Sequence, residues 1–510
     1  MKNTKNLCFS FILLLLCHPS FLLASNETLL NCGGATQTSD TDGRQWTSDI
    51  HSTFAPMADN TLTSPALTQD PSVPQVPFMT ARIFHSMFTY IFPVASGRNF
   101  VRLYFYPSSY AGLSASAAVF SVTTGPYTLL RNFSVSETTQ ALNYAFIVKE
   151  FSVSVVGSSL LNITFTPSPK LSNSYAFVNG IEIVSMPDIY ATTATLVGQS
   201  TPFVVANSTA LEKVSRLNVG GSDISPTGDT GLFRSWSDDF PYIFSAANGV
   251  AISAPSNMTI EYPPGFPNYV APVHVYSTAR SMGPTDYVNH NYNLTWVFQI
   301  DSGFYYLVRL HFCEIQPLFT KINQRVFNIF INNQTAVDGA DVVGWAGGNG
   351  IPVYKDYVAY VPEGNGQQDL WVELHPNVES LSSWYDAILN GLEIFKVNDS
   401  TGNLAGPNPI PVPKQEVINP TAINPVSGSE NSKNHTAIII GGILGGIAAV
   451  SCLIFLLVFR HHRQGKHSSS SYGPPGWLPL SLYGYSNSTG SGKTHTTSVM
   501  QLVQAEVEEV

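Results

Sequence analysis

The chain has 510 residues, of which 44% are hydrophobic, 12% are aromatic and only 11% are charged, and its formal net charge is −10. This length is enough for about three domains of ordinary size. A nucleic-acid-binding protein needs a strongly basic face, which this composition excludes. Sparse charge with abundant Ser, Thr, Asn and Gly is instead typical of an extracellular, β-rich protein, and the acidic balance favours a basic partner.

The first 24 residues predict a secretory signal peptide. Lys2 and Lys5 precede the apolar run Leu7–Cys17, which is too short to span a bilayer, and cleavage is expected after Ala24. The alternative is a buried first helix. A signal peptide predicts that the chain that follows is exported.

Three sequence patterns occur twice in the same order, 187 to 211 residues apart. The first reads Leu-Asn-x-Gly-Gly, then a Gly/Asp turn, then Trp-Ser/Thr-x-Asp. The paired stretches are Leu29–Asp49 with Arg216–Asp239, Ser96–Pro107 with Ser302–Glu314, and Tyr175–Pro187 with Tyr385–Asn398. This repetition predicts two copies of one domain, over residues 26–190 and 200–398.

Each copy is predicted to be a β-sandwich of jelly-roll type. Short runs of aromatic and β-branched residues are separated by Gly, Pro and Asn, and long stripes of helical period are absent. The predicted strands include residues 100–106, 151–156, 161–167, 306–312, 325–332 and 370–376. Asn-Gly at 179–180 and at 390–391 predicts tight turns with a positive φ at the glycine.

The residues after the second copy predict a membrane anchor. Residues 403–436 are rich in Pro, Asn and Ser and predict a semi-rigid stalk. Ala437–Phe459 has no charge and is long enough to span a bilayer, and the basic residues that follow it predict a cytoplasmic tail, 460–510. The expected topology is a type I single-pass protein. Close helix packing, and so an oligomer, is a further hypothesis from the small residues Gly441, Gly442, Gly445 and Gly446.

Nine Asn-x-Ser/Thr sequons lie on the predicted outer side and indicate a glycoprotein. They are Asn26, Asn132, Asn162, Asn207, Asn257, Asn293, Asn333, Asn398 and Asn434. Asn487 also fits the pattern, but it follows the predicted span and is expected to stay unmodified.

Two cysteines remain outside the signal and the span, so the chain is not a disulfide-stabilised scaffold. Cys32 and Cys313 either form one bridge between the copies or are two buried thiols. Buried thiols are favoured, because Val219 and Tyr106 occupy the corresponding positions of the other copy.

Leu-Asn-Cys-Gly-Gly with Asp-Gly-Arg-x-Trp-x-x-Asp, repeated as Leu-Asn-Val-Gly-Gly, resembles tandem malectin-like domains. With "LAGPNP" and the juxtamembrane "GWLPLSLYG" (Gly476–Gly484), the chain is similar to plant malectin-like receptor kinases of the FERONIA, ANXUR and THESEUS type. The resemblance implies a plasma-membrane receptor that binds secreted, cysteine-rich RALF peptides with GPI-anchored LORELEI-type co-receptors. It also implies sensing of wall polysaccharide such as pectin, and assembly with full-length receptors.

The same resemblance implies a cytoplasmic serine/threonine kinase, but residues 460–510 show none of its motifs. A Gly-rich loop, a His-Arg-Asp catalytic loop and an Asp-Phe-Gly motif are all missing from this sequence. We therefore expect no kinase activity from these residues. The sequence leaves open a receptor-like protein without a kinase, a fragment of a full-length receptor kinase and, as a third reading, a glycan-processing enzyme.

The candidate sites are few, and no catalytic residue, metal site or cofactor is expected. Asp238–Asp239, and Asp40 with Asp42, could be read as the paired carboxylates of a glycosidase, but their Gly/Asp/Ser contexts favour turns. Asp49 and Asp239 are expected to be structural. Trp46 and Trp236 are expected to anchor the cores.

Aromatic side chains suggest where sugar could stack. Tyr104, Tyr106 and Tyr110 are the candidates for ligand binding in the first copy. In the second copy Gln316 and Pro317 stand where malectin has an aromatic pair, which predicts that its disaccharide site is not preserved.

Overall fold

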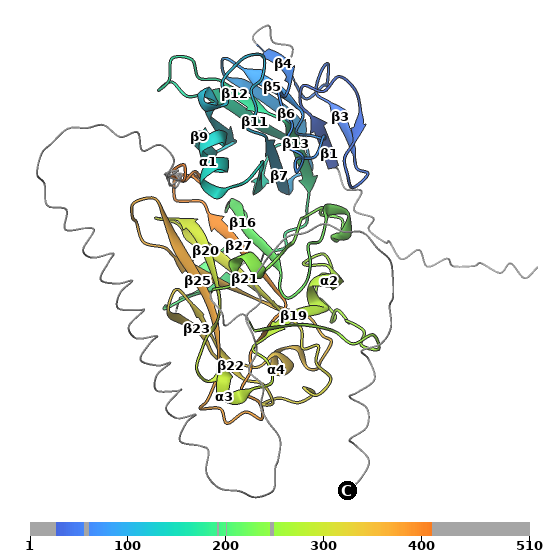
Figure 1. The fold of residues 1–510 in the computed structure, drawn as a ribbon, viewed down its shortest axis with the longest axis vertical. Coiled ribbons are helices and arrows are strands. Elements are labelled where there is room, and N and C mark those ends of the chain that lie inside the picture. Colours follow the sequence, from blue (N-terminus) through green and yellow to red (C-terminus); the bar gives the residue numbers. More distant parts are fainter. Residues whose placement is uncertain (1–26, 56–60, 191–192, 200, 245–248, 411–510) are drawn as a thin grey trace, which may run out of the picture. The chain divides into compact units, whose positions relative to one another are not determined.

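Two β-sandwiches account for most of the residues that the computed structural model describes, which are 27–55, 61–190, 193–199, 201–244 and 249–410 (Figure 1). The chain divides into two compact units, Met1–Gln415 and Glu416–Val510, and every described residue lies in the first. The predicted signal peptide, membrane span and tail, with Asn26 and Asn434, lie outside the described residues. Among the described residues no helix is long and apolar enough to cross a membrane.

In the first copy, one face of the sandwich is a sheet whose strands run in the order β10-β7-β13-β1-β3-β2. The other face consists of the sheet β6-β11-β8-β9 and the smaller sheet β12-β5-β4. The strands are β1 (Glu27–Asn31), β2 (Thr38–Ser39), β3 (Gln45–Ser48), β4 (Thr61–Pro65), β5 (Thr80–Phe84), β6 (Phe88–Pro93), β7 (Gly97–Phe105), β8 (Val119–Thr124), β9 (Tyr127–Ser134), β10 (Ile147–Val155), β11 (Leu160–Pro167), β12 (Ala176–Val178) and β13 (Gly180–Ser185). Its helices are η1 (Ala115–Ala117) and α1 (Val135–Leu142).

The second copy repeats this arrangement with the orders β15-β14-β24-β21-β27-β16, β20-β25-β22-β23 and β18-β19-β26. Its strands are β14 (Thr193–Leu196), β15 (Phe203–Val204), β16 (Leu211–Asn218), β17 (Ser237–Asp238), β18 (Val250–Ser253), β19 (Thr278–Ser281), β20 (Leu294–Asp301), β21 (Tyr305–Phe312), β22 (Phe327–Ile331), β23 (Gln334–Ala340), β24 (Val353–Tyr360), β25 (Gln367–Pro376), β26 (Ile388–Leu389) and β27 (Gly391–Val397). Its helices are η2 (Pro226–Gly228), η3 (Phe240–Tyr242), α2 (Val273–Tyr276), α3 (Asp286–Asn289) and α4 (Val342–Ala346).

The six predicted strands are confirmed as β7, β10, β11, β21, β22 and β25. Alternation marks β25, where one side is buried and Leu370, Val372 and Leu374 are fully buried, whereas β7 and β21 are nearly continuous apolar runs buried on both sides. Each copy has its own apolar core. Trp46 and Trp236 are each 1% exposed, as expected, and Cys32 and Cys313 are both buried free thiols.

The two Asn-Gly pairs were predicted as tight turns, and this prediction is wrong. Gly180 and Gly391 do not have a positive φ; each begins a strand as the chain passes from one sheet of its sandwich to the other. Glycine is required there for space, because a Cβ on Gly180 would lie 2.6 Å from the Pro77 side chain and one on Gly391 would lie 2.6 Å from Val275.

A single 13-stranded sheet continues from one copy into the other. The strands that join are β10 and β16, which pair antiparallel through Phe151 with Glu212 and Ser152 with Leu211. The sequence predicts two tandem domains, and in the structure the backbone ladder crosses the boundary between them.

Candidate functional site at the junction of the two copies

The repeated Trp-x-x-Asp motif positions a buried carboxylate in each copy. The Asp49 carboxylate accepts a 2.8 Å hydrogen bond from the Gly33 amide and a 2.6 Å bond from the Tyr90 hydroxyl. In the second copy Asp239 accepts from the Gly220 amide, from Trp296 Nε1 and from both Nε and Nη2 of Arg280. These contacts confirm that the motif is structural.

The first glycine of each Gly-Gly pair is required by the same arrangement. Gly33 has φ +77° and Gly220 has φ +68°. A Cβ on either one would lie within about 2 Å of a backbone carbonyl oxygen, that of Ala81 or of Ala279.

A row of alternating charges crosses the 13-stranded sheet from the first copy into the second. Each member stands on the next strand of the sheet, from β13 to β24. In order they are Glu182, Arg102, Glu150, Arg216, Glu393, Arg309 and Asp356. The side chains are at most 6% exposed, so the row lies inside the protein.

The row is bonded across the boundary between the copies. Glu150 of β10 accepts a 2.7 Å bond from Arg102 in its own copy and a 2.8 Å bond from Arg216 in the other. Arg216 also donates to Glu393 at 2.7 Å, and His311 Nε2 lies 3.1 Å from the same carboxylate. Because breaking a buried ion pair leaves an uncompensated charge, the row fixes how the strands align at the junction.

The neighbouring charges of the row, together with burial, determine the protonation states of its two central glutamates and of His311. Burial alone would raise the pKa of Glu150, but Arg216 and Arg102 outweigh burial and hold that pKa well below its usual range. Burial would also raise the pKa of Glu393, but Arg216 and the hydrogen bond with His311 hold it well below its usual range. Burial lowers the pKa of His311 despite its bond with Glu393.

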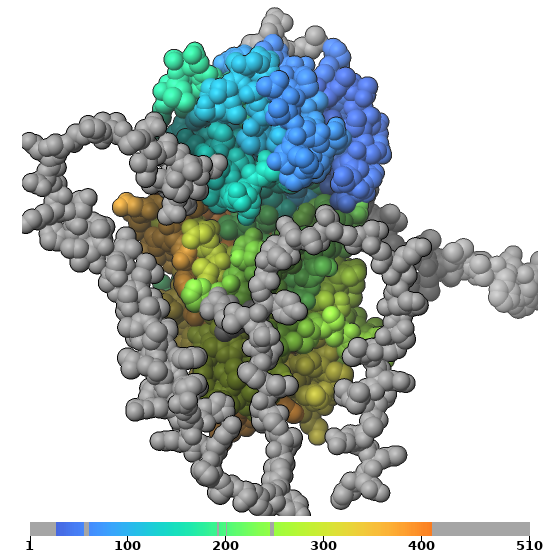
Figure 2. Space-filling view, viewed as in Figure 1, coloured from blue at the N-terminus to red at the C-terminus, as the bar shows by residue number. Residues whose placement is uncertain are grey.

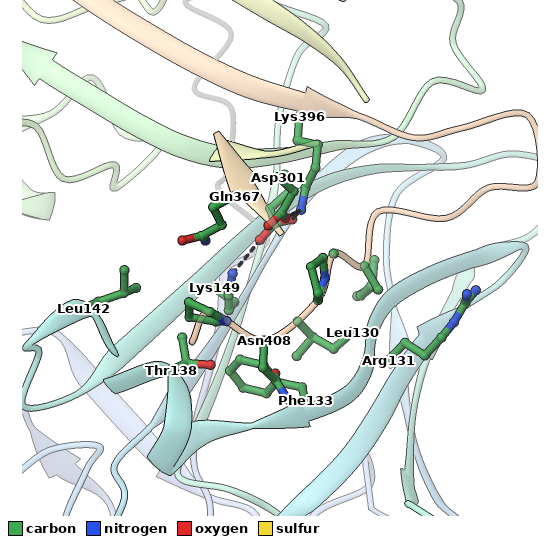
Figure 3. Close-up of a pocket in the computed structure, with 16 residues that line it drawn as sticks. Leu130, Arg131, Phe133, Thr138, Leu142, Lys149, Asp301, Gln367, Lys396 and Asn408 are labelled. Carbon is green, nitrogen blue, oxygen red and sulfur yellow. Dashed lines mark hydrogen bonds and ion pairs between the residues drawn. The ribbon is translucent and has the colours of Figure 1, made fainter. Parts of the chain in front are cut away.

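Two lysines and two carboxylates form a second cross-boundary network, beside a small cavity (Figure 3). Lys149 of the first copy and Lys396 of the second both bind Glu212, each at 2.7 Å, and Lys396 also binds Asp301 at 2.6 Å. Figure 3 shows this network next to Leu130, Phe133 and Asn408. On the face drawn in Figure 2, the spheres of the first copy (blue to teal) meet those of the second (green to orange).

Residues 399–410, which we call the clasp, run from the second copy back onto the first. Leu404 is fully buried in the core of the first copy, and its amide donates to the Thr128 carbonyl at 2.9 Å. The Thr128 amide donates in turn to the Gly402 carbonyl, and Asn408 bonds to the backbone of Asn132 and Ser134. The sequence placed the start of the stalk at residue 403, but 403–410 are packed, so this part of that prediction is corrected.

The cavity beside the clasp has a volume of about 70 Å³. A cavity of this size is far too small for a peptide or a polysaccharide, whose binding sites are several-fold larger. The ammonium groups of Lys149 and Lys396 are neutralised by Glu212 and Asp301. The network therefore holds the two copies together, and this cavity is not a binding site for a large ligand.

Two of the three candidate tyrosines lie inside the first copy, and Tyr104 is half-buried. Tyr110 is fully buried, Tyr106 is 7% exposed, and the Tyr104 hydroxyl donates to Glu182, a member of the charge row. Internal packing and hydrogen bonds turn Tyr106 and Tyr110 inward. Ligand binding by the three rings stays a prediction.

Seven of the predicted sequons fall within the described residues. Asn162, Asn207, Asn257 and Asn333 are exposed, as a glycosylated asparagine requires, whereas Asn132, Asn293 and Asn398 are half-buried. The amide nitrogen of Asn293 donates to Glu373, and that of Asn398 donates to the Asp399 carbonyl. Glycosylation at all seven stays a prediction.

The candidate carboxylate pairs have ordinary structural partners. Asp40 accepts from the amides of Asp42 and Arg44 and from Trp46 Nε1, which makes it a turn residue. Asp238 accepts from the Phe240 amide, while the neighbouring Asp239 is buried against Arg280. Within the described ranges, no group of three or more His, Cys, Asp or Glu is arranged to hold a metal.

The charge row was not predicted from the sequence, although both copies contain repeated charged residues that belong to it. The repeated Val-Arg-Leu places Arg102 and Arg309 at corresponding positions, and the repeated Asn-Gly-x-Glu does the same for Glu182 and Glu393. Charged residues that recur inside otherwise apolar strands indicate buried ion pairs. That signal was present in the printed sequence.

A family model described as the malectin-like domain matches residues 30–397. The chain belongs to this malectin-like family. Among curated proteins, it is 57% identical to the receptor-like protein kinase FERONIA of Arabidopsis thaliana over 98% of this chain and 57% of that one. It is 43% identical to ANXUR1 of the same organism, over 96% of this chain and 56% of the relative. The malectin-like chain thus spans little more than half the length of these relatives.

Solved structures agree with the malectin-like assignment. The crystal structure of the plant receptor-like kinase FER matches with a TM-score of 0.72 and 63% identity, over 76% of this chain and all of that one. FER in complex with the plant peptide RALF23 and LLG2 matches with a TM-score of 0.71 and 63% identity, over 76% of this chain and 98% of that chain. The resemblance to FERONIA-type receptors inferred from the motifs is confirmed.

Proposed function

We propose that this chain is a cell-surface receptor-like protein whose two joined copies bind a secreted, basic, cysteine-rich peptide of the RALF type. The observation that carries the proposal is the match to FER in its complex with RALF23 and LLG2, at 63% identity over 76% of this chain. The junction supports it, because a charge row and a shared sheet make the two copies one body that can present a fixed surface. A LORELEI-type co-receptor is the proposed second partner.

The charge of the chain favours such a peptide over pectin. With a formal net charge of −10, the protein attracts a cationic peptide at long range and repels a polyanionic pectin fragment. Binding of wall polysaccharide remains part of the proposal only for uncharged glycans.

The proposed location is the plasma membrane, with residues 27–410 outside the cell. The relatives are receptor-like kinases, and any kinase output belongs to proteins longer than these residues. We propose that signalling passes through a kinase in a longer product of the same gene or in an associated receptor. Sequencing the transcript beyond codon 490 separates these two routes.

The direct test is binding of a RALF-type peptide to the full chain, purified in detergent, with and without a LORELEI-type protein. Saturable binding that is tighter with the co-receptor present is the expected result. A scrambled peptide of the same composition is the control, because it keeps the charge and loses the shape. Equal binding of the native and scrambled peptides would contradict the proposed function.

A further inference from the structure

The two outer sheets of the sandwiches, which correspond to each other, differ sharply in charge. The strands β20, β25, β22 and β23 of the second copy contain Asp301, Asp338, Asp369 and Glu373 and no Lys or Arg. The equivalent strands β6, β11, β8 and β9 of the first copy contain one Arg and no Asp or Glu. The acidic character is therefore a property of one sheet and not of the fold.

Two of these carboxylates point to solvent without a cationic partner. Along β25 the buried residues alternate with Asp369, Trp371 and Glu373, which face outward. Asp369 accepts a hydrogen bond from Gln299, and Glu373 accepts a 3.0 Å bond from Asn293. Both donors are neutral amides, so the negative charge of the face is not compensated within the described part of the chain.

Aromatic rings lie between the carboxylates. The Phe244 ring is 52% exposed and packs edge-on against Trp371, with 4.8 Å between the ring centroids. Phe330 of β22 lies directly opposite Glu373, and Val297 of β20 lies opposite Trp371. Figure 1 shows β20, β25 and β22 within the second copy.

The first copy offers nothing comparable. The outward positions of its sheet include Thr89, Ser121, Thr123 and Thr164, and the exposed position in the middle of β11 is the sequon Asn162. In the second copy the nearest sequons, Asn293 and Asn333, lie outside the strands. A sugar chain is thus expected over the middle of the first copy's face, whereas in the second copy a sugar on Asn293 would lie beside Glu373 and leave Asp369 and Trp371 on its other side.

We propose that the outer face formed by β20, β25 and β22, centred on Asp369, Trp371 and Glu373, docks the cationic segment of a secreted peptide. Lysine and arginine side chains fit it in two ways at once. Their charges pair with the two carboxylates, and they stack on the faces of Trp371 and Phe244. The inference rests on the proposed function and adds to it the surface and the chemistry of recognition.

The test compares variants of the full chain, purified in detergent, in binding a basic RALF-type peptide by surface plasmon resonance. The double variant D369N/E373Q keeps the shape of both side chains and removes both charges. We expect its dissociation constant to rise by about 10-fold or more at low salt, mainly through slower association, and the difference to shrink as salt is raised. Trp371→Ala is expected to weaken binding at all salt concentrations, because stacking is screened little.

The matched control is Asp70→Asn, which neutralises an exposed carboxylate of the first copy. It is expected to leave the dissociation constant within about 2-fold, since a distant surface charge contributes little at moderate salt. Unchanged melting temperatures show that the variants are folded. If Trp371→Ala unfolds the chain, the double variant alone decides.

Three outcomes separate the proposals. Tight binding of the peptide by the unchanged chain and by D369N/E373Q alike overturns the docking face and leaves the proposed function standing. Absence of binding by the unchanged chain, with its co-receptor present, overturns both. Competition by an oligogalacturonide that is lost in Trp371→Ala assigns the face to an acidic glycan and contradicts the cationic-peptide proposal.

Discussion

In each sandwich one buried carboxylate, that of Asp49 or Asp239, binds a backbone amide in the turn that follows the first long strand. Asp239 is 1% exposed and accepts hydrogen bonds from the Gly220 amide, Trp296 and Arg280. Its neighbour Asp238 is half-exposed and only accepts a bond from the Phe240 amide. Asp239 is therefore expected to contribute much more to stability than Asp238, although the two are adjacent in the sequence.

Replacing Asp239 by Ala is expected to lower the free energy of unfolding by about 3–5 kcal/mol, because the buried Arg280 and Trp296 would lose the carboxylate that they bind. Asp238→Ala is the matched control and should cost about 0.5 kcal/mol or less. Urea denaturation of the two variants measures both values. Equal losses in the two variants would show that the Asp239 network is not what holds this turn.

We expect buried His311 to make the stability of the second copy sensitive to mild acid. Its two ring nitrogens lie 3.1 Å from Glu393 and 2.8 Å from the Tyr276 hydroxyl, and Arg309 stands nearby. Burial lowers its pKa, so below the unfolded value of about 6.5 the unfolded chain takes up more protons than the folded one. Stability contributed by neutral His311 is thus present above about pH 6.5 and is lost as the pH falls toward the folded pKa.

We therefore expect the melting temperature to fall between about pH 6.5 and pH 5, and His311→Gln to reduce that fall. Glu150 and Glu393 act at lower pH. Their pKa values are depressed in the folded state, so the stability they give is complete above about pH 4.3 and is lost below it. Thermal melts from pH 7 to pH 3 separate the two ranges. An identical pH profile for His311→Gln would contradict the role of His311.

At the scale of elements, the strands could be predicted from the sequence and their connections could not. Alternating burial marks β25 and β11, because a strand with one buried side has a period of two. The passage of the chain through Asn179 and Asn390 from one sheet to the other depends on contacts with residues about 100 positions away. No local pattern records such a contact, so the Asn-Gly pairs were read as turns.

The packing of the clasp could not be predicted from its local sequence either. "LAGPNP" has the composition of an extended linker, yet Leu404 completes the core of the first copy and Asn408 caps the end of β9. Whether a proline-rich segment packs or extends depends on whether a complementary surface lies within reach. That information belongs to the folded first copy, some 270 residues earlier in the chain.

Leu404→Ala is expected to lower the free energy of unfolding by about 2–5 kcal/mol, as for other fully buried leucines. It should also speed hydrogen exchange of the Thr128 amide, which donates to the Gly402 carbonyl across the clasp. Ile410→Ala is the control, because Ile410 is 85% exposed. Unchanged exchange at Thr128 in the Leu404 variant would show that the clasp stays attached without this side chain.

At the scale of the whole molecule, the duplication could be predicted from the sequence, but the joining of the two copies into one body could not. Two domains and a sheet-rich fold follow from repeated motifs. The β10–β16 pairing and the ion pair between Glu150 and Arg216 make them one body, and both need the folded geometry. The acidic outer face of β25 could not be predicted from the sequence either. It stands out only when its charges are compared with those of the equivalent sheet of the first copy.

If this united body receives a basic peptide on the outer face of the second copy, the peptide shields the side chains of that face from solvent. Hydroxyl-radical footprinting of the full chain, with and without a RALF-type peptide, tests it at the level of side chains. Phe244 and Leu160 are the residues to compare, since they are 52% and 53% exposed on the second and first copies. We expect the peptide to lower the labelling of Phe244 and to leave that of Leu160 unchanged. Protection of Leu160 with Phe244 unchanged would contradict it.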